Sequence, residues 1–210
     1  MSVWAIIPVK PLSRAKSRLA SALSPDERER LSEMWFRRVL MAVTATPQVA
    51  GTLVISRDTH ALAIARDLGA HTVQESGTPE LNNALMRATQ VVGGWRGAAV
   101  LILPADLSLI VSEDVSGMIE LGKEAHTVVI ATDGQGDGTN ALMTRPPGVI
   151  PYAYGSGSYQ RHIALAKEAG ATVKLFHSER LALDIDVPAD LEAYYRLDGS
   201  GREVPLTPEI

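Results

Sequence analysis

Short apolar runs and longer amphipathic segments alternate along the chain. The apolar runs predict seven strands, at residues 3–9, 52–56, 71–74, 98–103, 127–132, 140–144 and 172–176. Between them the spacing of apolar residues predicts helices at about 25–45, 59–68, 82–92, 112–121 and 159–169, and a last helix from Pro188. This alternation indicates one α/β domain with a mostly parallel central sheet over residues 1–197. Residues 198–210 are expected to form a flexible C-terminal tail.

The helix near residue 25 has the clearest boundary. Ser24 is a good cap, Pro25 suits the first helical position, and two acidic residues follow in the first turn. Its apolar stripe is expected to consist of Leu31, Met34, Trp35, Val39 and Val43.

Composition excludes several functional classes. The net charge of −4 over 210 residues argues against nonspecific nucleic-acid binding, which needs a basic surplus. The absence of cysteine excludes thiolate zinc sites, disulfides and cysteine nucleophiles. No apolar run approaches the length of a membrane span. We therefore expect a cytoplasmic protein without a membrane anchor; the sequence leaves its oligomeric state open, and a homodimer is compatible with it.

A basic segment directly follows the first strand. Lys10, Arg14, Lys16 and Arg18 lie within nine positions, where the strand is expected to lead into a turn and the start of a helix. Strand ends and helix N-termini present unpaired N–H groups, and the cations add formal charge, so the segment suits a bound anion. The alternative is a solvated basic helix face.

Aspartates recur at two other predicted strand ends. Asp106 comes just after the strand at 98–103, and Asp184 and Asp186 share one face of an extended segment near the C-terminus. Carboxylates from separate strand ends commonly hold Mg²⁺ beside the phosphates of a nucleotide. The competing interpretations are that Asp106 starts a turn or caps a helix, and that Asp186 caps the helix beginning at Pro188.

Two further loops carry polar residues. The segment 137–140 precedes and includes the start of a strand, and a Gly/Ser loop from Tyr154 to Ser158 opens a helix that contains His162. Backbone N–H groups and hydroxyls in such a loop suit a phosphate or carboxylate, whereas the alternative is a flexible surface turn with a packed or surface histidine. The first strand is not followed by a Gly-x-Gly-x-x-Gly or Walker motif, which disfavours the corresponding nucleotide-binding folds.

Taken in order and spacing, these segments resemble the CofC/FbiD family of guanylyltransferases of coenzyme F420 biosynthesis. The pieces that carry the resemblance are Pro8-Val9-Lys10, 15–19, 81–84, 103–107, 137–142, 154–162 and 184–191. The resemblance implies a nucleotidyltransferase fold similar to GT-A glycosyltransferases, with a Rossmann-like sheet.

The same resemblance implies the reaction. GTP and a small phosphorylated carboxylic acid (2-phospho-L-lactate, phosphoenolpyruvate or 3-phospho-D-glycerate) would give a guanylylated acid and pyrophosphate, and a separate transferase would use the product. Matched position by position, Thr139, Gly155 and Ser158 correspond to the acid-binding residues of the family, and Asp106 and Asp186 to its metal ligands. Tyr154, where Phe is usual, and Ser156-Gly157 depart from the family pattern and leave the acid open.

The chemistry of the residues assigns the remaining roles. Joining two phosphates needs charge neutralisation and alignment, so Mg²⁺ or Mn²⁺ on Asp106 and Asp186 would act with Lys16 and Arg18 as the catalytic groups. Lys10 and Lys16 are expected to bind the nucleotide. The resemblance places Asn82 near the base, because similar folds receive the base at the segment 81–84. Guanine also needs hydrogen-bond acceptors, which backbone carbonyls can supply.

Two other functions are compatible with these residues. One is a related sugar or molybdopterin nucleotidyltransferase, although such enzymes usually begin with a Gly-rich loop that this chain lacks. The other is a catalytically silent nucleotide-binding protein, which both aspartates and Lys16 argue against.

Overall fold

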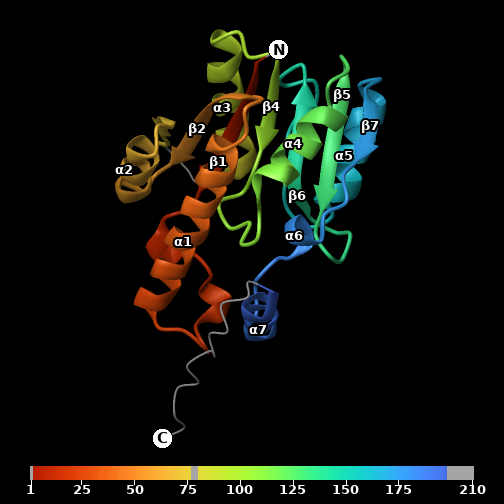
Figure 1. Cartoon of the computed structure of the whole chain (residues 1–210). Coiled ribbons are helices and arrows are strands. Elements are labelled where there is room, and N and C mark those ends of the chain that lie inside the picture. Colours follow the sequence, from red (N-terminus) through yellow and green to blue (C-terminus); the bar gives the residue numbers. More distant parts are fainter. Residues whose placement is uncertain (1, 77–79, 198–210) are drawn as a thin grey trace, which may run out of the picture.

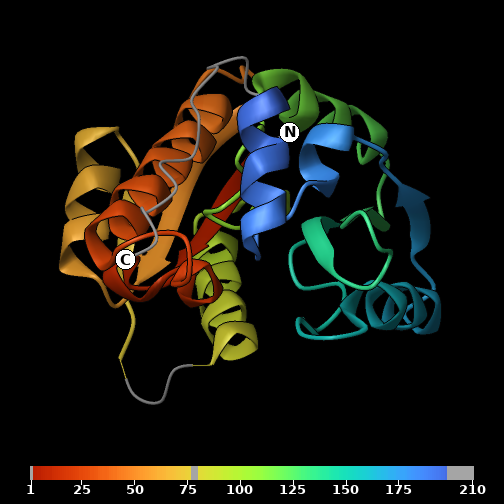
Figure 2. The ribbon, with the colours of Figure 1, turned by 90° about the horizontal axis from the view of Figure 1, so that it is seen from below.

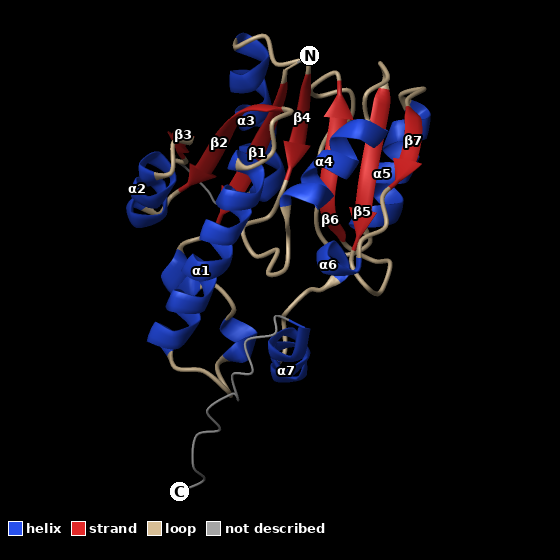
Figure 3. Cartoon of the chain, viewed as in Figure 1, coloured by secondary structure: helices blue, strands red, loops and turns tan. Residues whose placement is uncertain are grey.

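One seven-stranded sheet forms the centre of the molecule (Figures 1 and 3). The computed structural model describes residues 2–76 and 80–197, so the predicted tail at 198–210 lies outside the described residues. The strands lie in the order β3-β2-β1-β4-β6-β5-β7. Their bounds are β1 Val3–Val9, β2 Val49–Ser56, β3 His71–Gln74, β4 Ala99–Ile102, β5 Thr127–Thr132, β6 Thr139–Arg145 and β7 Thr172–Leu175. Only β6 runs antiparallel to its neighbours among these strands, which confirms the mostly parallel sheet.

Helices cover both faces of the sheet. The helices α1 (Pro25–Thr44), α2 (Thr59–Asp67), α4 (Ser112–Leu121) and the short α6 (Glu179–Ala182) contribute to a core on one face. On the other face, α3 (Leu81–Gly94) and α5 (Ser158–Glu168) pack in a second core. Consecutive strand residues alternate between these cores, as Ile6 and Ile7 do, because side chains of a strand point to opposite faces. No helix in residues 2–76 and 80–197 is long and apolar enough to cross a membrane.

The first long helix begins as predicted but buries a different stripe. Ser24 and Glu27 form a reciprocal capping box at its N-terminus. Met34 is 36% exposed, so its assignment to the apolar stripe was wrong. Phe36 and Leu40 are buried instead, because the sheet-facing side of α1 includes the positions directly after Trp35 and Val39.

The basic segment does not open an α-helix. It forms two short 3₁₀ helices, Leu12–Arg14 and Ser17–Leu19, with Lys16 between them in the left-handed conformation at φ 51°. A residue at positive φ cannot continue an α-helix, and Pro11 lacks a backbone N–H. The expected helix N-terminus at this anion site is therefore absent from this segment, and the cations lie on turns.

A third, smaller core lies between the segment after β1, the helix α1 and the last helix of the described chain (Figure 2). It contains residues of the basic segment, of α1, and of the last helix α7 (Pro188–Leu197) with the residues before it: Leu19, Leu23, Leu31, Trp35, Ile185, Leu191 and Tyr194. This packing brings the basic segment and the aspartates near residue 185 to the same side of the molecule.

Candidate active site

A cavity of about 620 Å³ opens at the carboxyl ends of β1, β2, β3 and β4. Ligands of open α/β sheets bind at this edge, and the volume suits a small-molecule ligand. Its polar lining comes from several elements and comprises Lys10, Arg14, Lys16, Ser17, Arg18, Ser32, Arg57, Glu75, Glu80, Asp106, Tyr154 and Asp186. The structure therefore brings the predicted basic segment and both predicted metal ligands into one cavity.

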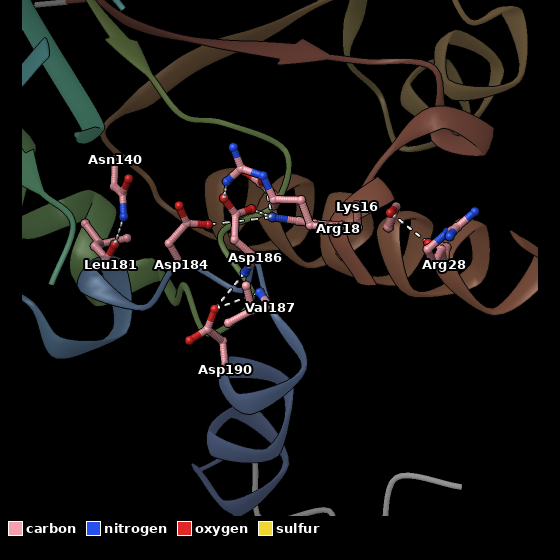
Figure 4. Close-up of polar contacts among 11 residues, drawn as sticks. Lys16, Arg18, Arg28, Asn140, Leu181, Asp184, Asp186, Val187 and Asp190 are labelled. Atoms are coloured by element: carbon pink, nitrogen blue, oxygen red, sulfur yellow. Dashed lines mark hydrogen bonds and ion pairs between the residues drawn. The ribbon is translucent and has the colours of Figure 1, made fainter. Parts of the chain in front are cut away.

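Lys16 is the centre of the charged cluster (Figure 4). Its Nζ lies 2.8 Å from Asp106 Oδ2, 3.6 Å from Asp184 Oδ1 and 3.6 Å from Asp186 Oδ1. Arg18 Nη1 adds a second cation, 2.6 Å from Asp186 Oδ2. The Lys16 side chain is 6% exposed, and the ring of Trp35 lies 5.7 Å from its ammonium. A lysine is seldom buried this deeply without anionic partners, and here three carboxylates supply them.

Neither aspartate predicted to bind a metal is used as a helix cap. The backbone N–H groups of Asp186 and Val187 donate to Asp190 Oδ2, at 3.0 and 2.9 Å, so Asp190 caps this segment (Figure 4). At α4 the N–H of Val111 donates to Asp114 Oδ2 at 3.2 Å, and Asp106 lies in the loop before it. The helix-capping alternatives were therefore wrong, whereas Asp106 does lie in a turn. The carboxylates of Asp106 and Asp186 face Lys16.

The pKa values of Asp106 and Asp184 are shifted in opposite directions. Burial alone would raise the pKa of Asp106, but the ammonium of Lys16 outweighs it and the pKa is lowered. Burial alone would lower the pKa of Lys16, but its carboxylate partners outweigh it and the pKa is raised. The pKa of Asp184 is raised by burial and by repulsion from Asp186 and Asp106, despite the nearby Lys16. Asp184 thus takes up a proton more readily than Asp106 does.

The donor set fits a small, hard divalent cation. Mg²⁺ is usually held by one or two carboxylates, with phosphate oxygens and water completing its shell. Asp106 and Asp186 already share one positive charge, that of Lys16. Within the described residues, no group of three or more His, Cys, Asp or Glu side chains is placed to hold a metal by itself. An ion at Asp106 and Asp186 would therefore depend on a ligand for its remaining contacts.

Asn82 has a structural partner at the edge of the cavity. Its Oδ1 accepts from the backbone N–H of Tyr154 at 2.7 Å, and its Nδ2 donates to the Tyr154 carbonyl at 3.4 Å. These bonds tie the start of α3 to Tyr154, which lines the cavity, whereas Asn82 itself does not. The predicted role of Asn82 at the base remains a prediction.

The residues predicted to bind the acid do not line the cavity, although Tyr154, which precedes Gly155, does. Thr139 and Ser158 are buried, with 5% and 1% exposure. His162 Nε2 accepts from the backbone N–H of Ala153 at 3.0 Å, so the neutral ring carries its proton on Nδ1 and donates to Thr139 Oγ1 at 2.9 Å. Burial and the charge of Arg161 lower the pKa of His162 to about 4, which favours this neutral form.

The Gly/Ser loop is held in place by an internal carboxylate. Asp137 Oδ2 accepts from the Gly157 N–H at 3.0 Å and from Ser156 Oγ at 3.4 Å. Gly155 and Gly157 have φ of 122° and 70°, which side chains rarely adopt. The loop is thus built around Asp137, and an acid substrate would have to share or replace that carboxylate at Gly157. The assignment of the acid-binding site to Thr139, Gly155 and Ser158 stays a prediction.

Three charged residues of the cavity, Arg57, Glu75 and Glu80, were missed from the sequence, and two of them follow strand ends. Arg57 directly follows β2 and Glu75 directly follows β3, and both line the cavity. The rule that identified Asp106, a polar residue just past a strand end, would have identified these two as well.

Comparison with known proteins places this geometry in a family. The family model described as "Guanylyl transferase CofC like" matches residues 3–204. A phosphoenolpyruvate guanylyltransferase of Rubrobacter xylanophilus is 39% identical over 96% of each chain. A 2-phospho-L-lactate guanylyltransferase of Methanothermobacter thermautotrophicus is 36% identical over 91% of this chain and 83% of that one.

The fold is that of nucleotidyltransferases. The solved structure of CMP:2-keto-3-deoxy-manno-octonic acid synthetase with CTP superposes with a TM-score of 0.66 at 13% identity, over 96% of this chain and all of that one. At that identity the likeness concerns the fold alone, and it confirms the predicted nucleotidyltransferase architecture. Family match, relatives and fold agree: the chain belongs to the CofC-like guanylyl transferases.

Proposed function

We propose that this protein transfers GMP from GTP to the phosphate of a small phosphorylated carboxylic acid. The observation that carries the proposal is the cluster of Lys16, Asp106 and Asp186 in the cavity of a CofC-like chain. Relatives named as phosphoenolpyruvate and 2-phospho-L-lactate guanylyltransferases support the substrate class. The product would serve a separate transferase of coenzyme F420 biosynthesis.

In the proposed reaction, a phosphate oxygen of the acid attacks the α-phosphorus of GTP. A new P–O bond forms, the bond from the α-phosphorus to the bridging oxygen of the β-phosphate breaks, and pyrophosphate leaves with that electron pair. The acid phosphate is already an anion, so no residue must remove a proton. The main requirements are alignment and charge neutralisation.

The charged residues supply that neutralisation. Lys16 and Arg18 would contact the phosphates of GTP. Lys10, from the same basic segment, also lines the cavity and would add positive charge. Asp106 and Asp186 would hold Mg²⁺ or Mn²⁺, which when bound supplies positive charge to the α-phosphate and the leaving pyrophosphate. Lys16, which contacts Asp106, Asp184 and Asp186, would then be shared between these carboxylates and the phosphates of GTP.

The test is pyrophosphate release from GTP with Mg²⁺ and each of 2-phospho-L-lactate, phosphoenolpyruvate and 3-phospho-D-glycerate. We expect release with at least one acid, none without acid, and formation of the guanylylated acid by mass spectrometry. The Asp106→Asn/Asp186→Asn double variant is the matched control. Wild-type protein that binds GTP but releases no pyrophosphate with any of the three acids, with either Mg²⁺ or Mn²⁺, would overturn the proposal.

A further inference from the structure

The cavity has two chemically different ends. At the β1 and β4 end lie the cations Lys16 and Arg18 with the carboxylates of Asp106 and Asp186. At the β2 and β3 end the lining is apolar, with Ile55, Leu81, Ala84 and Leu85, and contains the charged residues Arg57 and Glu75. The strands β3 and β4 are three positions apart in the sheet, about 14 Å at the usual strand spacing. An extended nucleotide can bridge the two ends, with phosphates at the cationic end and its base between the apolar walls.

Glu75 is fixed at the apolar end of the cavity. Its backbone N–H donates to the Ser56 carbonyl at 2.8 Å, which continues the pairing of β2 and β3 past the last strand residue. Its side chain is 13% exposed. Oε2 lies 3.5 Å from Arg57 Nε and Oε1 lies 3.5 Å from Arg87 Nη2. Arg57 and Arg87 therefore contact this carboxylate from two sides and fix its position.

The carboxylate nevertheless lacks a full set of donors. Oε1 is shielded from water and accepts no hydrogen bond from any residue in the described part of the chain. A buried acceptor without a donor costs free energy, and the cost is recovered when a ligand supplies the donor. The other acidic residue near this end, Glu80, is already used, because its oxygens accept from the backbone N–H groups of Asn82 and Asn83 at 3.0 and 2.6 Å.

We propose that Glu75 determines nucleotide specificity by accepting hydrogen bonds from the N1–H and the N2 amino group of guanine. The inference rests on the proposed function, which supplies GTP as the nucleotide. Guanine presents two adjacent donors on its Watson–Crick edge, which match the two oxygens of a carboxylate. Adenine and cytosine each present an unprotonated ring nitrogen at the corresponding position, which repels the carboxylate, and uracil presents one donor between two carbonyls. The guanine acceptor expected from backbone carbonyls is thus assigned to a side chain.

The experiment changes the hydrogen-bonding groups of the nucleotide base and of residue 75 together. Xanthosine triphosphate keeps N1–H but has a carbonyl at C2, so it matches the amide of Glu75→Gln and opposes the carboxylate of wild type. We expect wild type to bind GTP at least tenfold more tightly than xanthosine triphosphate, and Glu75→Gln to reverse that preference. Calorimetric dissociation constants and kcat/KM for both nucleotides give the ratio. A purely structural role for Glu75 would lower both affinities together and leave the ratio unchanged.

Two variants are matched controls. Glu33→Gln alters a carboxylate that also contacts an arginine and a second basic side chain, Arg37 and His60, but lies outside the cavity lining, and it should keep the wild-type ratio. Glu80→Gln alters the second acidic residue of this end and should also keep the ratio. A reversal in Glu80→Gln instead of Glu75→Gln would overturn the assignment.

A measurement on wild type keeps the inference testable even if Glu75→Gln does not fold. Inosine triphosphate lacks only the N2 amino group, so we expect it to bind about tenfold more weakly than GTP. Equal binding of the two would exclude the proposed contact. If GTP is bound with this selectivity but transferred to none of the acids, the proposed function fails and the inference stands. If transfer occurs and the selectivity is unchanged by Glu75→Gln, the inference alone fails.

Discussion

Asp190 accepts hydrogen bonds from the backbone N–H groups of Asp186 and Val187, and the carboxylate of Asp186 is thereby left to face Lys16 and Arg18. Asp190→Ala should lower the free energy of unfolding by about 1 kcal/mol, as expected for a lost cap, and should raise the Mg²⁺ concentration needed for half-maximal activity several-fold. Urea denaturation and Mg²⁺ titration measure the two effects. Asp190→Asn keeps an accepting oxygen and is the control. An unchanged Mg²⁺ requirement in Asp190→Ala would show that this cap does not position Asp186.

Replacing the proposed metal ligands should remove activity while preserving the fold. Asp106→Asn and Asp186→Asn should each lower kcat/KM by about 100-fold or more, because charge stabilisation in the transition state is lost. Binding of Mn²⁺ in the presence of GTP, followed by electron paramagnetic resonance, should weaken in parallel. If both variants turn over at near wild-type rates, the metal lies elsewhere, and Asp184 is the next ligand to test.

Removing the central ammonium should leave three carboxylates without their shared partner. Lys16→Met should lower turnover and GTP affinity, because the cation acts on the bound nucleotide and on the transition state. It should also lower the melting temperature, and Mg²⁺ should restore the melting temperature of this variant more than it raises that of wild type. Lys10→Met, a change at an exposed lysine of the same segment, is the control for stability. Equal Mg²⁺ effects on Lys16→Met and wild type would mean that ion and ammonium do not share these carboxylates.

Acid should destabilise the protein through His162. Its pKa in the folded state is about 4, below the ordinary value near 6.5, because burial and Arg161 disfavour the charged ring. Between those values the unfolded chain binds up to one proton more than the folded chain, so the free energy of unfolding falls as the pH falls from about 6.5 to 4. His162→Gln can accept from Ala153 and donate to Thr139 without titrating, and urea denaturation should show a shallower pH dependence. A wild-type slope retained in His162→Gln would assign the effect to other groups.

A substitution at Ser158 tests the predicted binding site of the acid substrate. Ser158→Ala should raise the KM for the acid roughly tenfold, the effect of one charge-assisted hydrogen bond, with little change in GTP affinity. Ser156→Ala changes the exposed serine of the same loop and should have a smaller effect. If Ser158→Ala weakens GTP binding and leaves the acid unaffected, the two substrate pockets have been interchanged.

The fold followed from the sequence because the central strands β1 and β4 are almost entirely apolar runs, and the edge strands still follow turn residues at regular spacing. Both ends of β1, at Val3 and Val9, were predicted correctly. The short helix α6 was missed because four residues give no helical periodicity. Met34 was wrongly assigned to the buried face of α1 because apolar spacing alone does not show which neighbouring positions face the sheet.

The site was only partly predictable, since hydrogen-bond partners depend on tertiary contacts. Lys16 and Asp106 were identifiable from charge type and position after a strand. That Asn82 binds the backbone of Tyr154, or that Asp190 rather than Asp186 caps α7, depends on residues brought together only by folding. Glu75 could have been found by its position, but its unfilled acceptor is visible only in the structure.

The small core that joins the basic segment to α7 also sets the order in which the site can be assembled during synthesis. Arg18 and Asp186 are separated by 168 positions, so the first half of the charged cluster leaves the ribosome long before its counterpart. Until Ile185, Leu191 and Tyr194 dock on Leu19 and Trp35, Lys16 lacks two of its three carboxylate partners. A nascent chain can therefore complete its sheet before its charged cluster is complete, and the last two carboxylates reach Lys16 only with the helix α7.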